Sequence, residues 1–475
     1  MKKKRKILIR LAAAVLAAGL FCLIAGSGAL YQMDNVVSDA LYQSEEATDN
    51  EIMVVGMDQR AMIELGAWPW SRKCIADAID FLNSDPENKP AVIAIDTMYV
   101  GESDDPEADA ALVEACRKGG NVVMAAAATF GSELQVEEEV FYMAQKQVLA
   151  WDQPFEALRE VTEMGHINAM LDQGKILRHA LLYVDVPGVG RVYSLPRVVY
   201  EKYCEVHGIE PNPLPKVSEG YDSQGFYYLP YSKVSGGYYE GVSVAALVDH
   251  EVDTKYFAGK IVLIGPYTYG FGDEYQTAID HSGATYGVEV MANEIENFRT
   301  GFYPDEVPEG LQLFLLFVIC FGMLLFFYDR HVLKALAAEL AVVIAWILLC
   351  IICYRCGLIF HVLWVPLFVT ILFIACVALN YVRAALEKRR VQNTFGHYVD
   401  PSIMQTLLDQ GSSALELGGK MYDIAVLFVD VRGFTTMSEN LDPPTVVEIV
   451  NRYLTLTTEC IIKNHGVLDK FVGDC

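Results

Sequence analysis

Four long apolar runs do most to limit how this chain can fold. They cover about residues 7–31, 311–328, 333–353 and 358–381. Each is close to the ~20 apolar residues that a helix needs to cross a bilayer. The hydrophobic content of 53% is concentrated in these runs, which is the pattern of a membrane protein rather than of a soluble one. The sequence therefore predicts four transmembrane helices and a multi-pass protein of the cell membrane.

Basic residues next to these runs indicate the orientation. Residues 2–6 are all Lys or Arg, Arg330 and Lys334 lie between the second and third runs, and four more basic residues follow the fourth run at 383–390. Cytoplasmic loops carry the excess of Lys and Arg, so both ends are expected inside and residues 32–309 outside; Arg355 alone opposes this. The first run exceeds the ~7–15 residues of a secretory leader, which favours an uncleaved anchor at residues 1–31, although Gly26–Ala29 would permit cleavage.

The net charge of −25 comes mostly from acidic residues between Tyr31 and Gly310. A surface this acidic repels phosphate backbones, which excludes nucleic acid as a partner. The 11 cysteines do not form a disulfide framework, because the outer segment holds only Cys74, Cys116 and Cys204, without close spacing. Cys353 and Cys356 form a CxxC pair with no second pair to complete a metal site.

The outer segment alternates apolar, strand-like runs with helical ones. Residues 52–56, 90–96, 121–126 and 260–265 have the composition of buried strands. Residues 72–82 and 109–116 have helical spacing. Alternation of strands and helices predicts an α/β sandwich around a largely buried sheet.

Two features of this segment have both a functional and a structural interpretation. Trp68, Trp70 and Arg72 are suited to the lip of a ligand site with cation–π character, or to a packed turn before a helix. Asp96 follows an apolar strand, where α/β sheets place functional side chains, but an aspartate there can also cap a helix or turn.

An ordered set of short phrases resembles the CHASE2 family: Gly66–Arg72, Val92–Asp96, Gly165–Asn168, Gly259–Gly265, Asp273 and Gly287–Glu289. CHASE2 domains are extracellular sensors that precede three membrane helices in bacterial cyclases and histidine kinases. The resemblance implies a sensor at 32–309, three membrane helices at 310–382, and an extracellular ligand that it does not identify. Residues 383–419 are then a cytoplasmic stalk and linker.

Residues 420–475 contain the most informative motif. An apolar run from Tyr422 ends on Asp430, a Gly-containing turn and a helical segment at about 443–462 follow, and a second run ends on Asp474. If both runs are strands of one sheet, the two aspartates meet. Two carboxylates ~4 Å apart repel by about 4 kcal/mol at an effective dielectric of 20, so they require a cation or a shared proton. Divalent metal ions suit such a pair. The alternative is that Asp430 is a turn residue and Asp474 a hairpin cap.

The phrases Phe428–Thr435 and Asp469–Asp474 resemble the class III adenylate and guanylate cyclases. That family has a ferredoxin-like α/β domain and works as a dimer with the substrate between subunits. By this resemblance, Asp430, Asp474 and the carbonyl of Val431 hold two Mg²⁺ or Mn²⁺ ions. Gly433, Phe434 and Thr435 lie in the phosphate-binding turn. Lys470 matches the position that reads adenine, so ATP is favoured over GTP and the expected reaction is formation of cyclic AMP and pyrophosphate.

The chain ends at Cys475, and the later base-reading and phosphorus-stabilising residues of that family have no counterpart in it. Residues 1–475 alone are therefore expected to be an inactive piece of a receptor cyclase, because such stabilisation contributes ~10²–10³ in rate. Other readings remain open: a guanylate cyclase, a sensor without catalysis, or a histidine kinase with His397 as phosphoacceptor. His397 lies between Gly396 and Pro401, a poor setting for a helical kinase dimer. The signature turn of a diguanylate cyclase is missing.

Overall fold

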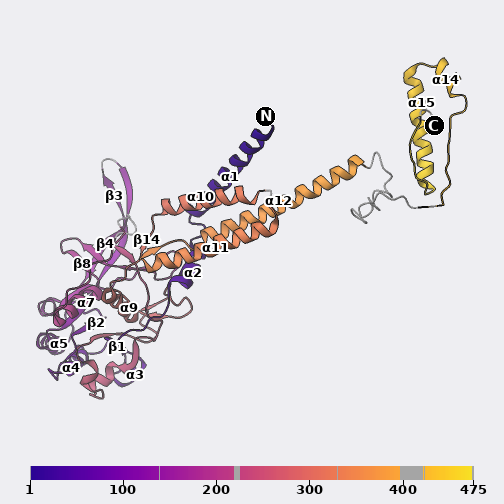
Figure 1. Cartoon of the computed structure of the whole chain (residues 1–475). Helices are drawn as coiled ribbons and strands as arrows, with labels where there is room; N and C mark the ends of the chain where they lie inside the picture. Colours follow the sequence, from indigo (N-terminus) through magenta and orange to yellow (C-terminus); the bar gives the residue numbers. More distant parts are fainter. Residues whose placement is uncertain are drawn as a thin grey trace. The chain divides into compact units, whose positions relative to one another are not determined.

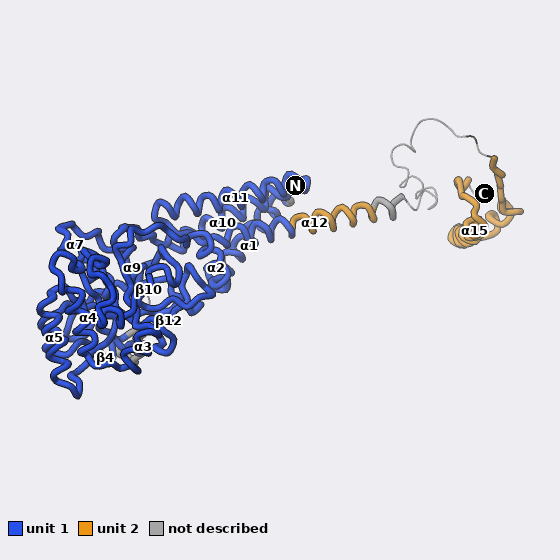
Figure 2. The backbone as a smooth tube through the Cα atoms, turned by 90° about the horizontal axis from the view of Figure 1, so that it is seen from below, with its two compact units in different colours: residues 1–374 blue, residues 375–475 orange. Residues whose placement is uncertain are grey.

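The computed structural model describes residues 2–137, 140–218, 225–328, 330–395, 421 and 423–472 (Figure 1). The chain divides into two compact units, residues 1–374 and 375–475, which Figure 2 colours separately. The division falls inside helix α12 (Trp364–Phe395). Each unit is described by itself.

Four helices are long and apolar enough to cross a membrane, as the sequence predicted. They are α1 (Lys2–Gly26), α10 (Glu309–Phe327), α11 (Val332–Arg355) and α12. Helix α1 packs along α10, where the thiol of Cys22 lies 3.4 Å from the carbonyl oxygen of Leu313. The fourth helix was expected to begin near residue 358 and instead begins at Trp364. The reason is that β15 (Leu358–Ile359) pairs in parallel with β14 (Asp305–Glu306) before the helix starts.

The segment that the resemblance predicts to be a sensor, residues 32–309 and called the sensor below, is built on a seven-stranded sheet. Its strand order is β10-β1-β11-β2-β3-β4, and β5 also pairs with β3. All pairs are parallel except β3 with β4. The four strands predicted from apolar runs are confirmed as β1, β2, β3 and β11. The strand bounds are β1 (Ile52–Met57), β2 (Val92–Ile95), β3 (Val122–Glu137), β4 (Val140–Asp152), β5 (Glu163–His166), β10 (Tyr239–Ser243) and β11 (Ile261–Pro266).

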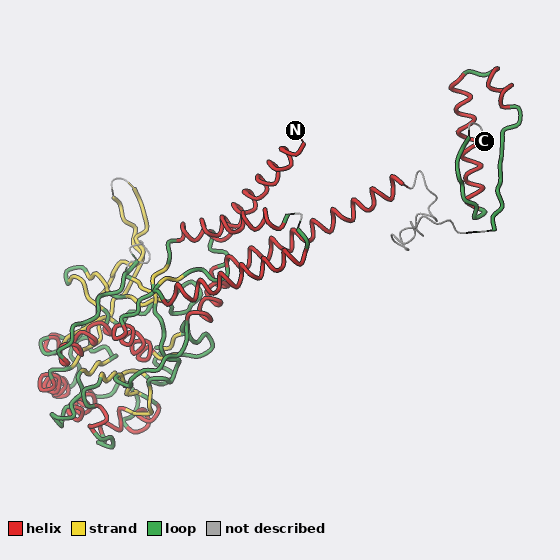
Figure 3. Tube along the Cα trace, in the orientation of Figure 1, coloured by secondary structure: helices red, strands yellow, loops and turns green. Residues whose placement is uncertain are grey.

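Helices cover both faces of this sheet, so the predicted α/β sandwich is confirmed (Figure 3). Successive strand residues point to opposite faces. Met53 and Val55 therefore pack with α4 (Arg72–Leu82), α5 (Pro106–Gly119) and α8 (Val244–Val248). Ile52 and Val54 pack on the other side with α7 (Leu195–His207) and α9 (Gly287–Thr300).

The other elements of this unit are short and connect these layers. They are α2 (Tyr31–Tyr42), α3 (Gln59–Glu64), α6 (Glu156–Arg159), η1 (Thr254–Phe257), β6 (His179–Leu181), β7 (Tyr183–Val186), β8 (Gly190–Tyr193), β9 (Phe226–Tyr228), β12 (Glu274–Tyr275) and β13 (Thr285–Tyr286). None of the cysteines that the structure describes forms a disulfide.

Beyond α12, the second unit contains helices α14 (Phe434–Asn440) and α15 (Pro443–Lys463), and α15 confirms the helix predicted at 443–462. The strands expected to end at Asp430 and Asp474 are not formed within residues 423–472. An isolated strand cannot satisfy its backbone groups without a neighbour. Val426, Leu427 and Phe428 are correspondingly 70%, 74% and 86% exposed. The described part of this unit thus does not show a ferredoxin-like domain.

Candidate functional site

The turn assigned to metal and phosphate binding runs from Asp430 to Thr435. The Asp430 carboxylate accepts a hydrogen bond from the Val431 amide at 2.9 Å, and the Val431 carbonyl accepts one from the Phe434 amide at 3.2 Å. Gly433 has φ +80°, a left-handed conformation that glycine adopts without strain, and it leads directly into α14. The structure thus brings Asp430, Val431, Gly433, Phe434 and Thr435 together in one short turn.

Carboxylate and carbonyl oxygens are the donors that Mg²⁺ prefers, so Asp430 and Val431 fit the expected metal in chemistry. The second expected ligand, Asp474, lies outside the described residues. Lys470 follows the far end of α15, is exposed, and has its ammonium 4.0 Å from the carboxylate of its neighbour Asp469. Within residues 423–472, the Lys470 side chain makes no hydrogen bond or ion pair with the turn. The two-metal site and the adenine contact stay predictions.

In the segment Trp68–Arg72, Trp70 and Arg72 make structural contacts, whereas Trp68 lines a cavity. Trp70 is buried and donates its indole N–H to the Gly66 carbonyl at 2.7 Å. The Arg72 guanidinium lies 2.9 Å from the Asp109 carboxylate and over the ring of Phe155. These two residues therefore belong to a packed turn. Trp68 instead lines a cavity that it shares with Asp96.

Asp96 lies just past the carboxyl end of β2 and is buried, and its Oδ2 atom has no hydrogen-bond partner. Burial, together with the nearby charge of Asp273, raises its pKa well above the usual range. Asp273 was noted in the sequence only as part of a family phrase. His166 was likewise noted only within the phrase Gly165–Asn168, and Ser194 was not noted, because these residues come from separate segments that only the fold brings together.

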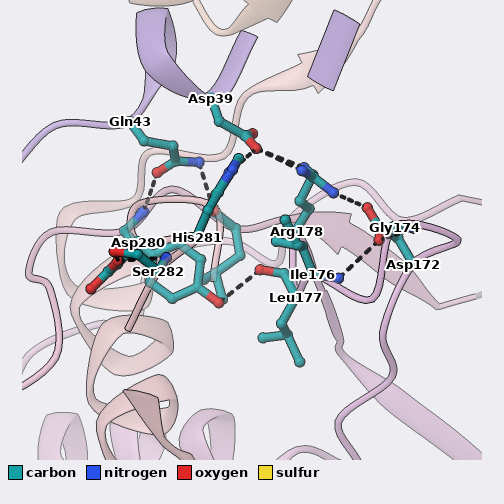
Figure 4. A network of polar contacts seen from close by, with 12 residues as sticks. Asp39, Gln43, Asp172, Gly174, Ile176, Leu177, Arg178, Asp280, His281 and Ser282 are labelled. Carbon is teal, nitrogen blue, oxygen red and sulfur yellow. Dashed lines mark hydrogen bonds and ion pairs between the residues drawn. The ribbon is translucent and has the colours of Figure 1, made fainter. Parts of the chain in front are cut away.

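A second polar centre joins the sensor to helix α2 and was missed in the sequence (Figure 4). Asp39 of α2 accepts hydrogen bonds from Arg178 at 2.9 Å and from His281 at 2.8 Å. Arg178 also pairs with Asp172, whose carboxylate accepts the backbone amides of Gly174 and Ile176. The side chains of Asp39 and Arg178 are 3% and 5% exposed. A buried carboxylate requires such partners, because leaving it unpaired is strongly destabilising.

Asp34 connects the same helix to the segment before α12. Its carboxylate lies 2.6 Å from the His361 imidazole and accepts the Leu363 amide at 2.8 Å. His361 stacks on Trp364, with ring centroids 3.9 Å apart. The backbone amide of His361 also donates to the side chain of Gln312 in α10 at 2.8 Å. Helix α2 is therefore tied to both the sensor and the membrane helices.

The space between these contacts is a cavity of about 450 Å³ that includes Asp34, Asp39, Arg178 and His361 in its lining. The sequence carried one signal for this junction: two carboxylates within the twelve residues of a helix that directly follows an apolar run. Such residues are normally solvent-exposed, and their burial depends on Arg178 and His361, which lie far away in the chain.

Comparison with known protein families agrees with this architecture. The family model described as the CHASE2 domain matches residues 13–326. This chain belongs to the CHASE2 family. The matched region of this CHASE2 protein extends from within α1, through the whole sensor, to the end of α10. The CHASE2 resemblance seen in the sequence is thus confirmed.

Similarity to individual proteins is confined to shorter stretches. An uncharacterized protein of Mycobacterium tuberculosis is 30% identical over 88 residues, which is 18% of this chain and 16% of the relative. An adenylate cyclase of Anabaena cylindrica is 28% identical over 103 residues, or 20% of each chain. The CHASE2 chain therefore spans a fifth or less of the length of these relatives. No solved structure matches it.

Proposed function

We propose that this CHASE2 protein is a membrane receptor whose outer sensor controls adenylate cyclase activity on the cytoplasmic side. The family match and the four apolar helices support a signalling receptor. The similarity to the Anabaena adenylate cyclase supports the proposal that the receptor controls adenylate cyclase activity. The distribution of basic residues around the apolar runs supports placing residues 32–309 outside and the C-terminal unit inside.

The observation that carries this proposal is the position of α2. Its two buried carboxylates contact the sensor through Arg178 and the membrane helices through His361. A change in the sensor that moves Arg178 must therefore either move α2 or break a buried ion pair. Removing one partner from such a pair costs about 3–5 kcal/mol, so movement of the helix is favoured.

The proposed catalysis uses the C-terminal turn. The carboxylate of Asp430, the carbonyl of Val431 and the carboxylate of Asp474 would hold two Mg²⁺ or Mn²⁺ ions. When bound, such ions help the ribose 3′-hydroxyl attack the α-phosphate and stabilise the leaving pyrophosphate. The amides around Gly433, Phe434 and Thr435 contact the terminal phosphates, and Lys470 donates to N1 of adenine. The active form is a homodimer with the nucleotide between its subunits.

The test is cyclic AMP production by membranes from cells that express the gene product from its own coding sequence. We expect ATP to be converted in the presence of Mg²⁺ or Mn²⁺, and Asp430→Ala to lower the rate by about 10²-fold or more, as expected for loss of electrostatic stabilisation. Glu459→Ala, an exposed position on α15 outside both family phrases, serves as the control. A preference for GTP would indicate a guanylate cyclase instead.

A second candidate is a sensor without catalysis. It is favoured by the lack of strands in residues 423–472, because a nucleotide cyclase site needs a sheet to bring its two aspartates together. Equal cyclic nucleotide levels in cells with and without the protein, for both ATP and GTP as substrate, would support this second candidate.

A further inference from the structure

The sensor has a cavity of about 430 Å³ at the carboxyl edge of its parallel sheet. Asp96 follows β2, His166 ends β5 and Pro266 ends β11, and all three residues line it. In open α/β sheets, ligands bind outside the carboxyl ends of the strands. The volume lies within the ~300–1,000 Å³ range of pockets for small molecules. The position and size therefore suit a ligand.

Buried polar atoms in this lining lack partners within the protein. Asp96 is 6% exposed and its Oδ2 atom makes no hydrogen bond, and the hydroxyl of Ser194, 2% exposed, makes none either. Buried polar groups in folded proteins are almost always hydrogen-bonded. Two such atoms at one cavity are groups that a bound molecule can satisfy.

The charged residues in the lining indicate whether a ligand is a cation or an anion. Three carboxyl groups line the cavity, those of Asp96, Asp273 and Glu294, and the lining contains no Lys or Arg. Its histidine, His166, is neutral, because burial lowers its pKa to about 3. The carboxyl groups are thus without a compensating cation from the described residues of the lining. A cationic ligand would supply one, whereas an anion would be repelled.

The remaining lining residues distinguish an organic cation from a metal ion. Trp68, Phe271 and Tyr275 line the same cavity, and the rings of Trp68 and Phe271 meet edge to face at 5.7 Å. Aromatic faces attract ammonium groups by cation–π interaction. Among the described residues, no group of three His, Cys, Asp or Glu side chains is arranged to hold a metal ion. Aromatic rings next to carboxyl groups match an organic ammonium ion better than a metal ion.

We propose that this cavity is the sensor's ligand site and that it binds a small organic ammonium ion. Asp96 supplies the main charge contact, because a cation bound beside it favours its ionised form. Asp273 lies beside Asp96, and Trp68 and Phe271 cover the alkyl part of the ligand. This proposal deepens the receptor role given above. The test below measures ligand binding and not cyclase activity. Its result can be interpreted even if the protein produces no cyclic AMP, and cyclase activity can be judged even if no probe binds.

The experiment measures thermal unfolding and tryptophan fluorescence of the full chain in detergent near pH 8. The probes are choline with its neutral isostere 3,3-dimethylbutan-1-ol, and benzylamine with benzyl alcohol, each up to about 10 mM. At least one ammonium probe is expected to raise Tm and to change the fluorescence in a saturable way, by the linkage between ligand binding and stability. Its neutral isostere is expected to do neither.

Variants assign the effect to the cavity. Asp96→Asn, which keeps the shape and removes the charge, is expected to weaken ammonium binding by about tenfold or more, equivalent to ~1.4 kcal/mol. Asp273→Asn gives a second, independent loss of charge. Asp104→Asn, an exposed position, is the matched control and is expected to bind as the unchanged protein does. The proposal is overturned if no ammonium probe shifts Tm, if the neutral isosteres bind equally well, or if both cavity variants retain full affinity.

Discussion

Asp39 and Arg178 form a buried, two-point ion pair although they lie 139 residues apart in the chain. One carboxylate oxygen of Asp39 lies 2.9 Å from Nε and 2.8 Å from Nη2 of Arg178. Asp39 belongs to α2, the helix that follows the first candidate membrane span, and this contact therefore joins the sensor to that helix (Figure 4).

Breaking this pair should cost much more than breaking an exposed one. Arg178→Gln is expected to lower the free energy of unfolding of the sensor by about 3 kcal/mol or more, because Asp39 and Asp172 are left buried without a full partner. Arg191→Gln removes the exposed pair with Asp185, where the side chains are 46% and 51% exposed, and should cost about 1 kcal/mol or less. Urea unfolding followed by tryptophan fluorescence measures both. Equal losses would contradict the assigned role of Arg178.

Asp34 provides a test of the contact with the membrane helices. Asp34→Ala is expected to destabilise the protein by about 1–3 kcal/mol, because the partly buried donors of His361 and Leu363 lose their buried acceptor. Gln32→Ala, on the exposed face of the same helix, is the control. Limited proteolysis between α2 and β1, compared for the two variants, reports the loosening. Identical cleavage rates would show that the Asp34 contact does not hold α2 in place.

The cavity carboxyls predict a distinct pH dependence of stability. Burial raises the pKa of Glu294 to about 8. The folded state therefore keeps a proton that the unfolded state has lost, so stability falls as pH rises toward 8. The lowered pKa of His166 acts in the opposite direction, but only below its usual value of about 6.5. Between pH 6.5 and 8 the raised pKa of Glu294 therefore affects stability more than the lowered pKa of His166 does. Burial also raises the pKa of the nearby Tyr227 and Tyr231, so both side chains stay neutral in this range.

The measurement is Tm between about pH 6.5 and 8 for the unchanged protein and for Glu294→Gln. The unchanged protein should lose stability across this range, by at most ~1.4 kcal/mol per pH unit from this group. The variant should show a smaller slope, and Asp96→Asn should also reduce it, because burial and Asp273 raise the pKa of Asp96. A rise in stability with pH in both proteins would contradict a raised pKa of Glu294 in the folded state.

Much of the sensor fold followed from the sequence because its strands are buried on both faces. Strands β1, β2 and β11 were predicted from nearly continuous apolar runs, and α4 from helical spacing. The sheet order did not follow, since β11 lies between β1 and β2 although it comes late in the chain. The strand before Asp430 was predicted by the same reasoning and was wrong for the described residues, because no neighbouring strand pairs with it.

The candidate functional residues could be predicted from the sequence only where they are neighbours in the chain. The turn at Asp430–Thr435 was predicted because its residues are consecutive. The Asp39–Arg178 pair and the Asp96 cavity were not, because their members come from distant segments and only the tertiary fold places them together. Asp96 was noted in the sequence only because it follows a strand. That its Oδ2 atom has no hydrogen-bond partner could be seen only in the folded structure.

The central claim is that the state of the sensor reaches a cyclase through helix α2. The most direct test compares cyclic AMP production from ATP in membranes that contain equal amounts of the gene product expressed from its own coding sequence, or of that product with Arg178→Gln or Arg191→Gln. We expect Arg178→Gln to change the rate by about threefold or more, the smallest typical coupling of roughly 1 kcal/mol, while Arg191→Gln leaves it unchanged. Equal rates in all three, or no cyclic AMP from any, would contradict the account.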